Sequence, residues 1–214
     1  MAIELHAWDT PNGRKISIAL EEMGLPYSNH PVDITKNKQF APAFLEMSPN
    51  NRIPAIVDTD GPDGKRISVF ESGAILIYLG EKTGKFYPAK GPEHIATLEW
   101  LMFQMGGFGP MPGQAHHYLG LDDSNLGKAY GADRYTKESA RLYGVMDRRL
   151  AKVPYFAGEN VTIADFSIIG WVWRHERHLI DLADYPNVKR WYEALMARPG
   201  VKRGFEFDIK SPKA

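Results

Sequence analysis

The order of strand and helix patterns in the first 87 residues is the feature that most constrains the fold of this chain. Apolar and polar residues alternate over Ile3–Trp8, which predicts a strand. Thr10 followed by Pro11 is typical of a helix N-cap and first helical position, and Gly24 is typical of the helix end. Further strands are expected at residues 27–32, 53–57 and 67–70, and further helices near 42–47 and at 72–81.

This order is β-α-β, then a helix, then β-β-α, and it predicts a thioredoxin-like α/β domain over residues 1–87. Ala89-Lys90-Gly91-Pro92 has the composition of a linker. Beyond it the strand patterns end, and helices are expected at 94–105, 133–150, 162–178 and 187–198. Residues 93–214 are therefore expected to form an all-α domain.

Composition excludes several classes of protein. The 26 Lys and Arg residues balance 26 Asp and Glu residues, and this zero net charge argues against nucleic acid as the main partner. Because the chain has no cysteine, it forms neither a disulfide nor a Cys-based zinc site, and any thiol chemistry must use a ligand's sulfur. No signal-peptide pattern is present, and no apolar run approaches the roughly 18 residues of a membrane span. We expect a cytoplasmic protein.

Thr10 and Asn12 lie in the first strand-to-helix turn, where chemistry is expected. Exposed N–H groups at a helix start stabilise an anion or a thiolate, and the pKa of a free thiol is roughly 8.5. The Thr10 hydroxyl or the Asn12 amide could donate a hydrogen bond to such a sulfur. The alternative is that Thr10 is only an N-cap and that Asn12-Gly13 only completes the turn.

A second group of candidates surrounds Ile53-Pro54 and Glu71-Ser72. A cis Ile53-Pro54 bond would turn the Ile53 N–H and C=O toward an extended peptide, although only about 5–6% of X-Pro bonds in folded proteins are cis. Glu71 would bind the ammonium of a γ-glutamyl peptide, and the Ser72 hydroxyl would bind its carboxylate. The alternative is an ordinary helix start with Ser72 as N-cap.

The polar residues that surround these candidates in sequence could pair with a ligand carboxylate. They are Gln39, Arg52, Lys36 and Lys38. For the two lysines a solvated surface position is the more common outcome.

Three further motifs are expected to be structural. The adjacent His116 and His117 point to different sides of a helix and have no suitably spaced acidic partner, so no metal site is expected. The glycine run at 106–109 is expected to break a helix so that a ligand or another chain can approach. The Thr162–Asp165 segment is a capping box, and Asp165 is therefore not expected to be a catalytic acid.

Taken in this order, these residues resemble the cytosolic glutathione S-transferase superfamily over about residues 2–205. The runs at 10–13, 48–56, 70–75 and 106–117 are similar to the bacterial Nu class, which is related to a yeast nitrogen regulator of the same fold. The resemblance implies the glutathione transferase fold, a homodimer, and glutathione or its disulfide as the bound cosubstrate without a metal.

The resemblance also implies roles for individual residues. Thr10 and Asn12 would lie near the glutathione sulfur, and Arg134 would reach in from the partner subunit. For Arg134 a solvated helix arginine is the alternative. The residues implied to hold the glutathione backbone are Gln39, Arg52, Ile53, Glu71 and Ser72. Candidates for a second-substrate pocket in the helical domain are Phe108, Tyr118, Trp171 and Trp173.

Nu-class members reduce disulfides with glutathione, so the resemblance implies a glutathione-dependent disulfide reductase with weak transferase and peroxidase activity. Other transferase classes activate the sulfur with a Tyr, Ser or Cys in the first turn, whereas this turn is Trp8-Asp9-Thr10-Pro11-Asn12 and Ser17 lies deeper in the helix. Two alternatives stay open. One is a transferase that conjugates electrophiles, and the other is a non-catalytic glutathione-binding regulatory protein.

Overall fold

The computed structural model describes residues 3–212, which form two compact units. The first unit contains the residues up to Tyr87 and those from Met196 onward, and the second unit is Pro88–Leu195. The residues from Met196 onward therefore do not group with the helical domain, to which the sequence analysis assigned them. No helix within residues 3–212 is both long enough and apolar enough to cross a membrane.

The first unit contains a four-stranded mixed sheet with the strand order β2-β1-β3-β4. β1 and β2 are parallel, while β3 runs antiparallel to both β1 and β4. The strand bounds are β1 Ile3–Ala7, β2 Tyr27–Pro31, β3 Ala55–Asp58 and β4 Ile67–Phe70. β3 begins two residues later than expected, since Pro54 has no N–H to donate to a ladder. The predicted thioredoxin-like order is confirmed.

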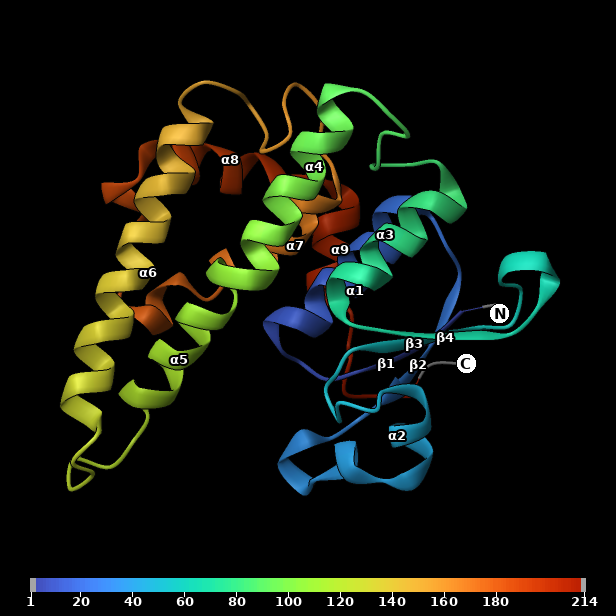
Figure 1. The fold of residues 1–214 in the computed structure, drawn as a ribbon, viewed down its shortest axis with the longest axis horizontal. Helices are drawn as coiled ribbons and strands as arrows, with labels where there is room; N and C mark the ends of the chain where they lie inside the picture. The colour runs from blue at the N-terminus through green and yellow to red at the C-terminus, as the bar shows by residue number, and fades with distance from the viewer. Residues whose placement is uncertain (1–2, 213–214) are drawn as a thin grey trace. The chain divides into compact units, whose positions relative to one another are not determined.

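Helices cover both faces of this sheet, with α1 and α3 on one face and α2 on the other (Figure 1). The helix bounds are α1 Pro11–Met23, α2 Pro42–Met47, α3 Ser72–Thr83 and α9 Pro199–Glu206. Short 3-10 turns occupy Ile34–Lys36, Lys38–Phe40 and Pro62–Gly64. The predicted ends of α1 are confirmed, because Thr10 caps its start and Gly24 adopts the left-handed conformation at its end.

α9, which the sequence analysis did not predict as a separate helix, packs against α1. A Cβ atom on Gly204 would lie 2.6 Å from the Ile18 Cα atom, so this close approach requires glycine. The Gly204 carbonyl accepts hydrogen bonds from Arg14 Nη1 at 3.0 Å and from Ser17 Oγ at 2.8 Å. Asn29 Nδ2 donates to the Ile209 carbonyl at 2.9 Å. The C-terminal segment is thus attached to α1 and β2.

The second unit is helical throughout the residues that the structure describes. Its helices are α4 Pro92–Phe103, α5 Pro110–Leu119, α6 Lys128–Leu150, α7 Ile163–Val172 and α8 Pro186–Met196, with 3-10 turns at His175–His178 and Leu182–Asp184. α5 and α6 lie side by side, and α4 packs on α7 (Figure 1). The expected helix over 162–178 ends at Val172, and the bounds of α5, which carries His116 and His117, were not predicted.

The glycine run at 106–109 was expected to break a helix, but the chain stays helical through most of it. Gln104–Phe108 form a π-helical turn that leads directly into α5. Cβ atoms on Gly109 and Gly113 would lie 3.2 and 3.1 Å from the Trp171 ring, so these two glycines let α5 approach Trp171 of the same unit. Phe108 is completely buried, and it is therefore a core residue and not a pocket residue.

Asp165 organises the start of α7, and the predicted capping box is confirmed. Its buried Oδ1 accepts hydrogen bonds from Phe156 N at 3.2 Å and Trp191 Nε1 at 2.8 Å. Its Oδ2 accepts from Thr162 N at 2.8 Å and Thr162 Oγ1 at 3.2 Å. Burial raises the pKa of Asp165, and these four hydrogen bonds oppose that rise. Since all four donors come from the core, the role of Asp165 is structural.

Asp165→Asn is predicted to lower the free energy of unfolding by about 1–3 kcal/mol, because an amide offers one acceptor oxygen where two are used. Asp165→Ala, which leaves four buried donors unpaired, is predicted to lower it by more than about 3 kcal/mol. Chemical denaturation measures both values. The control is Asp133→Ala, which removes only an exposed pair with Lys137. An Asp165→Asn variant as stable as the parent would contradict the account.

Candidate functional site

Three segments expected to carry function meet at one edge of the sheet. His6 of β1 is paired with Ala55 of β3, and Ala55 is paired with Phe70 of β4. The residues that follow β1, precede β3 and follow β4 therefore lie at the same end of three adjacent strands. These residues are the 8–12 turn, Ile53-Pro54 and Glu71-Ser72.

The N-terminus of α1 lies at this edge. The Thr10 Oγ1 atom accepts a hydrogen bond from Gly13 N at 3.1 Å, so Thr10 is the N-cap that the alternative interpretation required. That bond uses the hydroxyl as an acceptor, and its hydrogen remains a donor. Asn12 is half-buried in the first turn. Gly13 is needed where it is, because a Cβ atom there would collide with the Trp8 carbonyl.

Arg14, which the sequence analysis did not single out, fixes the geometry of this turn. Its Nε and Nη2 atoms lie 2.9 and 2.8 Å from Asp9 Oδ1. A third contact runs from Nη1 to the Phe207 carbonyl at 2.7 Å. A buried arginine with these partners holds the 8–10 turn against the C-terminal segment.

The Ile53-Pro54 peptide bond is cis, which is the conformation that the functional interpretation requires. Ile53 precedes the β3 ladder and packs against a small core cluster of Val32, Phe44 and Ala55. Ser48 Oγ donates to the Arg52 carbonyl at 2.8 Å and so fixes the segment that enters the site. The Arg52 side chain is exposed.

Glu71 and Ser72 follow β4 at the same edge. Glu71 has a positive φ of 68° and occupies the N-cap position of α3 without a side-chain capping bond. Ser72 is the first helical residue, so the alternative in which Ser72 is the N-cap is wrong. The Ser72 side chain is buried, and its Oγ atom accepts a hydrogen bond from Lys15 Nζ at 3.2 Å.

Gln39 lies in the 3-10 turn Lys38–Phe40. Its side-chain amide oxygen could accept a hydrogen bond from a ligand. Its Oε1 atom is buried and has no hydrogen-bond partner within residues 3–212. A buried acceptor without a donor is costly, and a ligand N–H would satisfy it.

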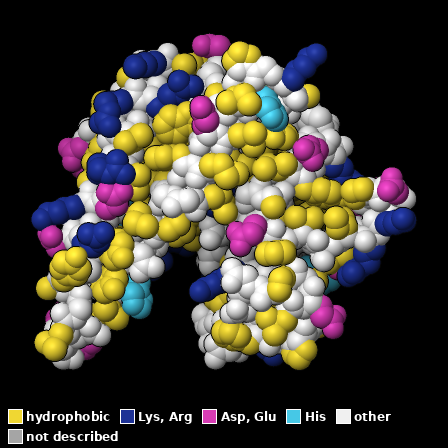
Figure 2. Space-filling view, viewed as in Figure 1, with side chains coloured by type: hydrophobic (Ala, Val, Ile, Leu, Met, Phe, Trp, Pro, Cys, Tyr) yellow, Lys and Arg dark blue, Asp and Glu magenta, His cyan; other side chains and the backbone are white. Residues whose placement is uncertain are grey.

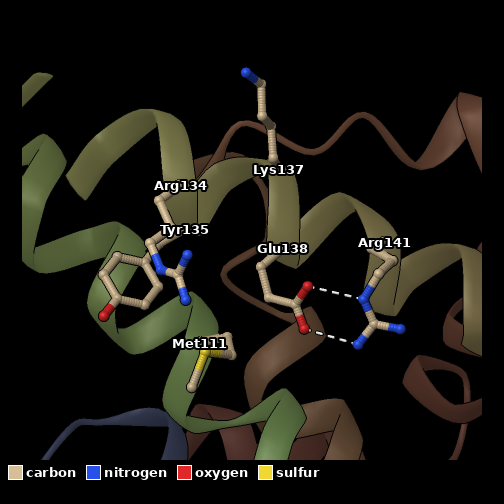
Figure 3. A pocket seen from close by; sticks show the side chains of 6 residues that line it. All are labelled: Met111, Arg134, Tyr135, Lys137, Glu138 and Arg141. Atoms are coloured by element: carbon tan, nitrogen blue, oxygen red, sulfur yellow. Dashed lines mark hydrogen bonds and ion pairs between the residues drawn. The ribbon is translucent and has the colours of Figure 1, made fainter. Parts of the chain in front are cut away.

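Arg134 belongs to the second unit, where it lines an open cavity of about 460 Å³ between α5 and α6. The other lining residues are Met111, Tyr135, Lys137, Glu138 and Arg141. Figure 3 shows the Arg134 guanidinium pointing toward Met111, while Lys137 points away. Within residues 3–212, Arg134 forms no ion pair within 4.0 Å.

Glu138 is held by Arg141 through two contacts of 2.8 and 2.7 Å (Figure 3). The hydrogen bonds from Arg141 lower the pKa of Glu138, and the charges of Arg141 and Arg134 act in the same direction. Figure 2 shows Lys and Arg side chains interspersed with acidic ones along the part of the second unit that α6 forms. The cavity thus holds a cation, Arg134, that has no ion-pair partner of its own among residues 3–212.

His116 takes part in a buried hydrogen-bond chain. Its Nε2 atom lies 2.8 Å from His178 Nδ1, and His178 Nε2 lies 2.9 Å from the Tyr143 hydroxyl. Burial lowers the pKa of His116 to about 4 and that of His178 to about 3, and nearby positive groups add to both shifts. In the described part of the chain, no three His, Cys, Asp or Glu side chains gather as a metal site would require.

The lowered pKa values predict how stability depends on pH. Both histidines are neutral when folded and titrate near 6.5 when unfolded, so their contribution is present above pH 6.5 and is lost as pH falls toward 4. The free energy of unfolding is predicted to fall by up to about 1.4 kcal/mol per pH unit per histidine. His178→Gln, which does not titrate, should flatten this slope in denaturation curves. A slope in His178→Gln equal to that of the parent protein would contradict the assignment.

Comparison with known proteins identifies the family of this chain. The family described as "Glutathione S-transferase, N-terminal domain" matches residues 10–82, and "Glutathione S-transferase, C-terminal domain" matches residues 114–199. The chain therefore belongs to the glutathione S-transferase family, which confirms the resemblance drawn from its residues. It is a glutathione transferase-like enzyme with the fold of that family.

Three relatives are informative. The chain is 48% identical over 200 residues to disulfide-bond oxidoreductase YfcG of Escherichia coli, covering 93% of this chain and 92% of YfcG. A glutathione transferase from Burkholderia graminis, crystallised with two glutathione molecules per subunit, has a TM-score of 0.90 and 42% identity over 98% of this chain and 89% of its own. One from Pseudomonas putida, crystallised with one glutathione disulfide per subunit, has a TM-score of 0.90 and 40% identity over 96% of this chain and 91% of its own.

Proposed function

We propose that this protein is a glutathione-dependent disulfide-bond reductase in which both reacting sulfurs belong to ligands. The observation that carries the proposal is the absence of cysteine from a chain whose capped α1 N-terminus lies at the same end of the sheet as Ile53-Pro54 and Glu71-Ser72. The name of the Escherichia coli relative supports the reaction. The Burkholderia and Pseudomonas structures support the ligands, because they hold two glutathiones and glutathione disulfide.

The proposed reaction has two exchange steps. The thiolate of a first glutathione attacks a disulfide, forms a new S–S bond, and expels one half of that disulfide as a thiolate, which takes up a proton. The thiolate of a second glutathione then attacks the glutathione sulfur of this mixed disulfide, which releases glutathione disulfide and the second thiol. The protein contributes position and a lower thiol pKa.

Individual residues have proposed roles in this reaction. Asn12 and the Thr10 hydroxyl donate to the glutathione sulfur at the positive end of α1. The Ile53 backbone pairs with the extended ligand, while Glu71 binds its ammonium. Ser72 and Arg52 bind carboxylates, and the buried Gln39 oxygen accepts a ligand N–H.

Asn12→Ala is predicted to reduce the turnover of a hydroxyalkyl disulfide with glutathione by roughly 10²-fold or more, as expected when one donor to a developing anion is lost. Glutathione reductase and NADPH report the glutathione disulfide formed. Asn160→Ala, an exposed asparagine of the second unit, is the matched control and should retain full activity. Unchanged turnover in Asn12→Ala would place the sulfur elsewhere.

The same preparations separate the alternatives. Fast conjugation of an aryl halide with slow disulfide reduction would show a transferase for electrophiles. Glutathione binding without turnover of disulfide, electrophile or hydroperoxide would show a regulatory protein. The proposal expects fast disulfide reduction with weak transferase and peroxidase activity.

We further propose that the protein acts as a cytoplasmic homodimer in which Arg134 reaches the glutathione of the partner subunit. Arg134, in the cavity between α5 and α6, has no ion-pair partner within the described residues. A ligand carboxylate would supply such a partner, which supports this role.

Mixing two inactive variants tests this arrangement. Asn12→Ala and Arg134→Ala homodimers are each predicted to lose most activity, while Arg148→Ala on the same helix should not. After subunit exchange, half of the dimers are mixed, and one of their two sites is intact, so activity should recover to about one quarter of the parent. Absence of recovery, with exchange shown by native mass spectrometry, would mean that Arg134 does not act across the dimer.

A further inference from the structure

We propose that Lys15 is a positioning residue for the carboxylate end of a γ-glutamyl ligand, because it orients the Ser72 hydroxyl and balances the charge of that carboxylate. This inference rests on the proposed function, and it deepens that function by naming a residue beneath the ligand site. Lys15 sits on α1, one turn beyond Asn12, and its Nζ atom reaches Ser72 Oγ on α3 at 3.2 Å.

The burial of Lys15 is the first unusual observation. Its relative exposure is 1% and that of Ser72 is 4%. No other lysine is buried among the residues that the structure describes. Lysine is almost never fully buried unless it is paired with an opposite charge, since removing an ammonium from water costs several kcal/mol.

The position of the ammonium is the second unusual observation. Its Nζ atom donates a hydrogen bond to the first residue of α3, where the N–H groups and the helix dipole are already positive. A cation there adds to that positive potential, so the pair of groups is suited to an anion. Burial lowers the pKa of Lys15 to about 7, and the charge of Glu71 acts against this shift.

The hydrogen-bond direction explains how Lys15 acts through Ser72. An ammonium can only donate, so Ser72 Oγ is the acceptor. The Ser72 hydroxyl hydrogen is then directed away from Lys15 and can be donated to a carboxylate. The charges also balance, because Glu71 faces the ligand's ammonium while Lys15 and the α3 N-terminus face its carboxylate.

Several other charged groups on or next to elements packed against α1 are ion-paired. On α9, Arg203 pairs with Glu21 at 2.8 Å, and before α9 Arg198 pairs with Glu22 at 2.5 Å. Next to β1, Asp9 pairs with Arg14 at 2.8 Å. On β1 itself His6 and Glu4 are 3.4 Å apart. Glu71, before α3, is the acidic group that acts on Lys15.

Calorimetric titration with S-methylglutathione tests the proposal, because this probe keeps the γ-glutamyl end but has no thiol to titrate. Heats measured in buffers of different ionisation enthalpy give the protons taken up on binding. The parent protein should take up protons on binding, with more uptake at pH 8 than at pH 7, and its affinity should fall as the pH rises above 7.

Lys15→Met keeps the length of the side chain and removes its charge. This variant should lose the proton uptake and the pH dependence of affinity, and should bind at least tenfold more weakly at pH 6.5. Its unfolding temperature should not fall, because a buried ammonium is replaced by an apolar group. Lys85→Met, the same substitution at an exposed lysine that donates to the Met23 carbonyl, is the matched control and should keep the proton uptake.

The outcomes separate this inference from the function on which it rests. Proton uptake in the parent that disappears in Lys15→Met supports it. Tight binding of the probe without proton uptake, or uptake that persists in Lys15→Met, overturns the inference and leaves the proposed function intact. No binding of the probe to the parent protein overturns both.

Discussion

The site in the first unit depends on the fixed position of helix α1. Thr10 caps its start, Gly13 lets that start lie against the Trp8 carbonyl, and Gly204 lets α9 lie against its middle. Arg14 ties the preceding turn to the C-terminal segment. The sheet register places this helix start at the same end of the sheet as Ile53-Pro54 and Glu71-Ser72. One helix therefore provides both the positive end that we propose for the ligand sulfur and the cation that donates to Ser72.

Local patterns were sufficient to predict the strands, the ends of α1 and the capping box at Asp165, since each depends on residues close in sequence. They were not sufficient for α9, whose place on α1 depends on Gly204 and Ile18, far apart in sequence. Lys15 was missed for a related reason. Its neighbours in sequence do not reveal that α3 covers Lys15, so the sequence predicts an ordinary surface lysine where the structure has a buried one. Glu71-Ser72 was singled out from the sequence as a candidate site, but only the backbone shows that Ser72 is not the N-cap.

Because the chain has no cysteine, both sulfurs of an exchange reaction must belong to ligands. The protein's contribution is then limited to holding each glutathione in place and stabilising the thiolate, and every proposed site residue serves one of these two purposes. In the proposed reaction, Thr10 and Asn12 stabilise the glutathione sulfur, and the residues that hold its peptide are Gln39, Arg52, Ile53, Glu71 and Ser72.

The central claim is that the N-terminus of α1 stabilises the thiolate of bound glutathione. The most direct measurement is a pH titration of the ultraviolet thiolate band of glutathione bound to the parent protein and to Asn12→Ala. The account predicts that the bound thiol ionises well below the pKa of a free thiol, which is roughly 8.5, and that Asn12→Ala moves it back toward that value. A bound thiol that titrates at the free value in the parent protein would contradict the account.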